Sequence, residues 1–113
     1  MKIKVFTGGN FFVNSYILYN NSKEAVLIDP GLSLDEYKGF IYSKKLTIKY
    51  ILLTHAHVDH ILRVNEIKDF TQAEICLHKN DLPIYNQAHT MAQYFGIMDM
   101  SHPYPVDTFI EDG

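Results

Sequence analysis

The chain has little cysteine, no long apolar run and no excess of positive charge. Cys76 is the single cysteine among 113 residues, so no disulfide can form within the chain, and its apolar neighbours favour a buried, inert thiol. No stretch of about 18 apolar residues could span a membrane, and the amino-terminal segment lacks the continuous apolar stretch of a signal peptide. We therefore expect a cytoplasmic protein without a membrane partner.

The charge and composition narrow the class further. A net charge of −3 and a pI near 6.0 give no basic field for nucleic acid, so we expect no nucleic-acid partner. With 47% hydrophobic and 20% charged residues the composition is that of a globular protein, and 113 residues predict one domain or less.

What the chain does have is a cluster of metal-binding side chains in Thr54-His55-Ala56-His57-Val58-Asp59-His60. Composition alone rarely brings three of six histidines and an aspartate so close together. Neutral imidazole and carboxylate are the usual non-thiolate ligands of zinc, and they also suit iron and manganese. The cluster therefore predicts a site for a divalent metal, and the identity of that metal stays open. The remaining histidines are isolated, and we expect structural or surface roles for His78, His89 and His102.

The position of the cluster in the chain predicts how its ligands point. The apolar run at 48–53 predicts a buried strand, so the ligands should follow its carboxyl end, where α/β folds place their sites. Side chains at i and i+2 of an extended segment lie on the same side, so His55 and His57 can bind one ion together. Asp59 and His60 come where the chain should turn into a helix, facing a second ion or the same ion from another side.

The remaining patterns predict alternating strands and helices. Three strands near residues 2–6, 13–19 and 24–29 form a β-meander that ends in the turn Asp29-Pro30-Gly31. A capping box from Ser33 to Glu36 starts a helix that should end near Lys44-Lys45. The later elements are a helix containing Ile61, Val64 and Ile67, a short strand at 74–77, an interrupted helical region from Asn80 to about Gly96 and a strand at 106–110.

The segment Thr-His-Ala-His-Val-Asp-His resembles the H-x-H-x-D-H signature of the metallo-β-lactamase superfamily. Asn14-Ser15-Tyr16-Ile17-Leu18 and Ala25-Val26-Leu27-Ile28-Asp29-Pro30-Gly31 look like the opening strands and turn of its hydroxyacylglutathione hydrolase (glyoxalase II) branch. One departure is that Leu62-Arg63 follows Ile61 where the family usually has two glycines.

The resemblance implies an αββα sandwich made of two similar halves, of which this chain matches the N-terminal half. We expect an α/β unit with a mixed sheet and helices packed on one face, spanning residues 1–113 and apparently truncated. The family's other three ligands come from the second half, so the chain carries four of the usual seven, namely His55, His57, Asp59 and His60. Asp29 lies near the metal loop in the family, which implies that it holds backbone or a ligand; the alternative is an ordinary turn aspartate.

For the complete protein the resemblance implies a metal-dependent hydrolase that acts on a small-molecule thioester such as an acylated glutathione. One metal would be held by His55 and His57, and a second by Asp59 and His60, with a hydroxide between them; Asp59 is the catalytic residue as the anionic ligand. We expect two zinc ions, with iron or manganese as alternatives. The 113 residues alone should bind metal weakly or not at all, because each ion has only two ligands here.

Two alternatives stay open. A mononuclear iron enzyme of the persulfide dioxygenase type resembles the same branch and would leave Asp59 without a metal. The other is an inactive half-domain that serves as an assembly or binding module. For this 113-residue chain, an uncovered sheet face and edge would favour homo-oligomers, whereas a monomeric, metal-free and folded chain would favour the half-domain alternative.

Overall fold

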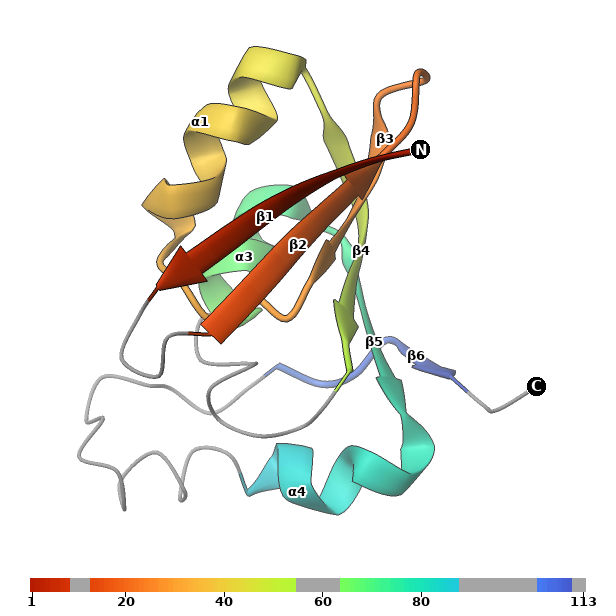
Figure 1. Cartoon of the computed structure of the whole chain (residues 1–113). Coiled ribbons are helices and arrows are strands. Elements are labelled where there is room, and N and C mark those ends of the chain that lie inside the picture. The colour runs from red at the N-terminus through yellow and green to blue at the C-terminus, as the bar shows by residue number, and fades with distance from the viewer. Residues whose placement is uncertain (9–12, 55–63, 88–103, 111–113) are drawn as a thin grey trace.

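The residues that the structure describes form a six-stranded mixed sheet with two helices packed against one of its faces (Figure 1). This computed structural model describes residues 1–8, 13–54, 64–87 and 104–110. β1, β2 and β3 pair antiparallel, and the pairs from β3 to β6 are parallel. The predicted meander and mixed sheet are confirmed. The strands lie side by side in sequence order: β1 (Lys2–Gly8), β2 (Val13–Tyr19), β3 (Glu24–Ile28), β4 (Thr47–Leu53), β5 (Glu74–His78) and β6 (Thr108–Ile110).

The two packed helices are the connections between parallel strands. α1 (Leu34–Lys44) joins β3 to β4, and α3 (Val64–Thr71) lies between β4 and β5. Right-handed crossovers that advance in one direction along a sheet place their helices on the same face, which accounts for the one-sided layer. α4 (Leu82–Asn86) follows a short 3₁₀ helix and has Pro83 in its first turn. No helix in the described ranges is long and apolar enough to cross a lipid bilayer.

The start of α1 corrects one prediction. Ser33 is the N-cap residue, but its side chain makes no capping hydrogen bond. The amide of Glu36 donates instead to the backbone carbonyl of Ser33, at 3.0 Å. The first amide of the helix, that of Leu34, donates to the Glu66 carboxylate of α3 at 2.9 Å. Glu66, which lies far along the chain, thus supplies an acceptor at the start of α1 that a capping box would not provide.

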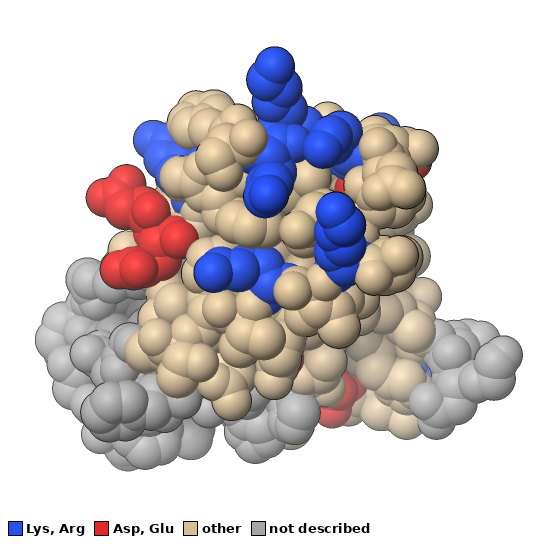
Figure 2. All heavy atoms as spheres, turned by 45° about the horizontal axis from the view of Figure 1, so that its top comes forward, with Lys and Arg blue, Asp and Glu red and all other residues tan. Residues whose placement is uncertain are grey.

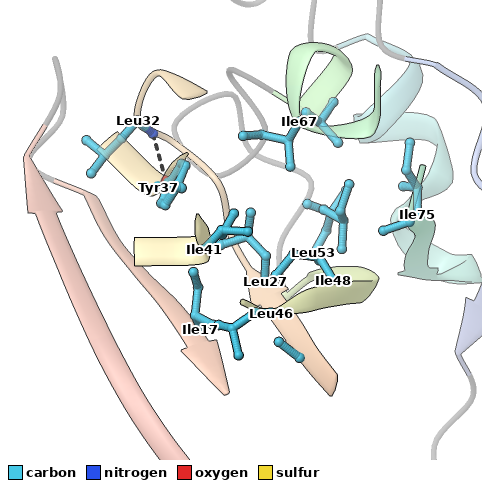
Figure 3. Packing of buried hydrophobic residues seen from close by; sticks show 14 of the residues in the cluster. Ile17, Leu27, Leu32, Tyr37, Ile41, Leu46, Ile48, Leu53, Ile67 and Ile75 are labelled. Carbon is cyan, nitrogen blue, oxygen red and sulfur yellow. Dashed lines mark hydrogen bonds between the residues drawn. The ribbon is translucent and has the colours of Figure 1, made fainter. Parts of the chain in front are cut away.

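The core lies between the sheet and the helix layer (Figure 3). One row of cross-strand partners, fully buried, runs over four strands through Ile17, Leu27, Ile51 and Ile75. The register between β3 and β4 shifts at Ala25 and Val26, so that Lys49 is an extra residue in β4. This irregularity lets Ile48 and Ile51 both face the core although they are three positions apart. The sheet therefore presents β4, the strand before the metal motif, as a central strand fixed on both edges.

Candidate metal centre

The first predicted metal ligand, His55, is separated from the end of β4 by a single residue, Thr54. This strand ends at Leu53 between two parallel neighbours, and Thr54 follows it. His55, His57, Asp59 and His60 lie outside the described residues, so their convergence on metal and the start of a helix at His60 stay predictions. What the structure describes is the framework on each side of them, which consists of Thr54 and the helix that starts at Val64.

Asp29 holds the backbone immediately before the ligand cluster. Its carboxylate accepts the amide proton of Thr54 at 2.9 Å through Oδ1 and the Thr54 hydroxyl at 2.6 Å through Oδ2. Its own amide donates to the carbonyl of Leu52 at 3.0 Å. Only 4% of Asp29 is exposed, and its φ of 55° lies in the left-handed region that aspartate tolerates better than most residues. The part of the prediction that this aspartate holds backbone is therefore confirmed, and the residue does more than form a turn.

Ser15 and Tyr37 hold the Asp29 turn through hydrogen bonds that sequence reasoning missed. The buried Ser15 hydroxyl donates to the carbonyl of Asp29 at 2.6 Å, and the Tyr37 hydroxyl donates to Ser15 Oγ at 2.8 Å. The amide of Leu32 in turn donates to the Tyr37 hydroxyl at 3.1 Å (Figure 3). Burial raises the pKa of Tyr37, so the hydroxyl keeps the proton that it donates. The available signal was Ser15 itself, a polar residue at an inward strand position beside Ile17.

Glu66 is the second residue that sequence reasoning missed. It lies in the first turn of α3, shortly after the ligand cluster, and accepts the amide proton of Leu34. A carboxylate near a helix N-terminus satisfies a backbone donor and interacts favourably with the helix dipole. Since the helix it caps is α1 rather than its own, no local pattern could have indicated the contact.

A group of lysines lies at the opposite end of β4 from the candidate centre. Figure 2 shows lysines gathered over the end of the molecule where α1 ends and β4 begins. Lys44 and Lys45 end α1, and the carbonyl of Lys23 accepts the amide proton of Thr47 at 2.8 Å. The length of β4 separates Thr47 from Thr54 by about 23 Å, which exceeds the screening length at physiological salt. These cations therefore do little to oppose cation binding near Thr54.

No competing metal site is present in the segments that the structure describes. Among them no group of three or more His, Cys, Asp or Glu side chains could hold an ion. His78 instead caps the helical turn after β5, because its Nδ1 accepts the amide proton of Asn80 at 3.1 Å. His89 and His102 lie outside the described residues. The donor set at 55–60, three imidazoles and a carboxylate, fits a divalent transition metal by its chemistry.

The helices pack on one face of the sheet, and the metal-binding motif follows β4, which lies between two parallel neighbours. Residues 8–113 match the family model of the metallo-beta-lactamase superfamily. The chain belongs to this superfamily, and the resemblance stated from its motifs is confirmed.

Individual relatives agree with this assignment. The hydroxyacylglutathione hydrolase GloC of Haemophilus influenzae is 27% identical over 114 residues, which cover 100% of this chain and 54% of the relative. The probable metallo-hydrolase YqgX of Bacillus subtilis is 33% identical over 81 residues, covering 72% of this chain and 38% of the relative. The crystal structure of TTHA1623 in a di-iron-bound form superimposes with a TM-score of 0.83 at 31% identity, covering 96% of this chain and 54% of that one. The chain thus spans about half the length of the relatives that it matches along its whole extent.

Proposed function

We propose that the complete protein is a metal-dependent hydrolase whose substrate class is a small thioester, such as an acylated glutathione. Membership of the metallo-beta-lactamase superfamily supports hydrolysis, and the similarity to a hydroxyacylglutathione hydrolase supports the substrate class. The observation that carries the proposal is the pair of hydrogen bonds from Thr54 to the buried carboxylate of Asp29. These hydrogen bonds hold the backbone at Thr54, immediately before the first predicted ligand, His55.

The residues of the chain divide the work between binding and positioning. His55 and His57 would hold one ion, and Asp59 and His60 a second, while Asp29 keeps the preceding backbone in place. A metal held there would lower the pKa of its bound water to about 7, which would supply hydroxide at neutral pH, and a pair of metals would stabilise the attacking and leaving oxygens together. The residues that contact substrate are expected largely in the part of the protein that these 113 residues do not include.

Two substitutions in the full-length protein test which of these ligands binds which ion. His57→Ala should lower metal content and thioester hydrolysis together, because it removes one of the two ligands that this chain supplies to the first ion. Asp59→Asn should spare the ion held by His55 and His57 and still reduce turnover, because it removes the anionic ligand of the second. Metal content per chain and the steady-state rate with an acylated glutathione are the two measurements.

His78→Asn is the matched control, because asparagine can still accept the Asn80 amide proton. We expect it to retain metal and activity. If His57→Ala and Asp59→Asn both matched the wild type, the binuclear assignment would be wrong. Oxygen uptake with bound iron and no thioester hydrolysis would favour the dioxygenase alternative instead.

A further inference from the structure

One short segment of the chain contacts the residues on both sides of the ligand cluster. This segment, residues 29–34, is named here the turn segment; it runs from the end of β3 into the first residue of α1. In sequence the ligand cluster at 55–60 lies between Thr54 and Glu66, and each of these two residues is hydrogen-bonded to the turn segment.

The two contacts differ in which partner supplies the carboxylate. Before the cluster, Asp29 of the turn segment accepts from the amide and hydroxyl of Thr54. After the cluster, Glu66 of α3 accepts from the amide of Leu34, at the other end of the turn segment, at 2.9 Å. Both are hydrogen bonds to charged acceptors, which are about twice as strong as neutral ones.

The turn segment is itself held rigidly. The hydroxyl of Tyr37 accepts the amide proton of Leu32 and donates to Ser15, whose hydroxyl donates to the carbonyl of Asp29. Tyr37 is fully buried, and its ring meets that of Phe6 edge to face with centroids 5.0 Å apart. A buried, satisfied network of this kind fixes the backbone to which it bonds.

We propose that Glu66 and Tyr37 are positioning residues of the metal centre, acting through the turn segment that fixes both ends of the ligand-bearing chain. Holding Thr54 and Glu66 in place before metal binds reduces the conformational entropy that the intervening chain loses on binding. The ligands therefore bind the ion more tightly. Supporting residues of this kind alter metal affinity by about 10- to 100-fold. The inference rests on the proposed function, since it assumes that residues 55–60 bind metal.

Glu66→Ala and Glu66→Gln in the full-length protein separate positioning from charge. Glutamine keeps a carbonyl oxygen that can accept the Leu34 amide proton, whereas alanine keeps no acceptor. Zinc affinity, measured by competition with a chromophoric chelator, should fall about tenfold for Glu66→Ala and return most of the way for Glu66→Gln. Cobalt(II) absorption should shift for the alanine variant, because the ligand geometry relaxes.

Asp69→Ala is the matched control, because it removes a carboxylate from the same helix that is bonded to the Tyr104 hydroxyl and not to the turn segment. We expect wild-type affinity for it. Tyr37→Phe is the second variant and should also weaken zinc binding, with faster amide hydrogen exchange at Leu32 in metal-free protein. Equal zinc affinity of Glu66→Ala and wild type, or equal losses for Glu66→Ala and Glu66→Gln, would overturn the proposal. A wild-type protein that binds no metal would instead overturn the proposed function.

Discussion

The two faces of the sheet come from the same strands but are covered very differently. On the helix side, Ile17, Leu27, Ile51 and Ile75 are fully buried. On the opposite side, named here the open face, Ile3 is 63% exposed and other apolar residues are exposed or half-buried. The open face comprises the alternate residues Ile3, Val5, Tyr16, Leu18, Val26, Ile28, Tyr50 and Leu52.

The two faces differ in how far their side chains are exposed, although both are made of apolar residues. A sheet with one face in water normally alternates apolar and polar residues, because the outer side chains are solvated. Here the cross-strand partners on the open face are also apolar, as Val5, Tyr16, Ile28 and Leu52 show in one row. This is the pattern of a sheet covered on both sides, which is the inner-layer position that the αββα resemblance implies.

The largest effect should come from truncating the covered face. Ile51→Ala should lower the free energy of unfolding by about 2–5 kcal/mol, because it leaves a cavity in a fully buried row. Ile3→Ala makes the same chemical change on the open face, and in the 113-residue chain, at concentrations where it is monomeric, we expect a loss below about 1 kcal/mol because little of that side chain leaves water on folding. Urea unfolding monitored by circular dichroism measures both. Equal losses would show that something buries the open face.

A second, intermediate effect concerns self-association. The isolated 113-residue chain should form dimers or larger assemblies through its open face, since large apolar patches tend to find a partner. The double variant Val5→Lys with Tyr50→Lys should restore the monomer mass of 13.1 kDa in light scattering. Tyr42→Lys, which changes a 63% exposed tyrosine of α1, is the control and should leave assembly unchanged. A wild-type chain that stays monomeric at high concentration would contradict this prediction.

The smallest effect belongs to the rim where the helix layer meets β6. Asp107 accepts the amide proton of Ile75 at 2.8 Å and pairs with Lys68 at 2.9 Å, and these contacts lower the pKa of its carboxyl. Because the folded pKa lies below the unfolded one, the stabilisation is present above about pH 4 and is lost as the pH falls through the folded pKa.

Asp107→Asn should therefore reduce stability at neutral pH and cease to differ from wild type in acid. The carboxyl is partly exposed, so we expect less than about 1 kcal/mol. The urea-unfolding midpoints of both proteins, measured from neutral pH to about pH 2, test whether the difference in stability disappears as the pH falls. A difference that grows as the pH falls would contradict the assigned cause.

Much of the fold could be predicted because its signals are local. Alternation gave the β-meander, and helical spacing with Lys44-Lys45 gave α1 to within a residue. The shift at Lys49 could not be predicted, because it depends on how β4 pairs with β3. The capping box at Ser33 was wrong for a related reason: the acceptor at the helix start is Glu66, which lies 32 residues from Leu34.

The candidate site, like the fold, has residues that local sequence patterns could predict and residues that they could not. His55 and His57 could be assigned as a ligand pair because i, i+2 spacing is a local property of an extended chain. Ser15 and Tyr37 were missed because their hydrogen bonds join residues 14 and 22 positions apart. Tyr37 is fully buried, and the hydrogen bonds of a buried hydroxyl leave no signature in the apolar spacing of a helix.

The most direct test of the central claim is the metal content of the purified full-length protein after incubation with zinc, iron or manganese and removal of free ions. If the chain after β4 supplies ligands to a binuclear centre, the wild type should retain about two ions per chain. His57→Ala should retain fewer, and His78→Asn should match the wild type. A folded wild-type protein that retains none of these metals, or retains them equally after His57→Ala, would contradict the assignment of residues 55–60 as the metal centre.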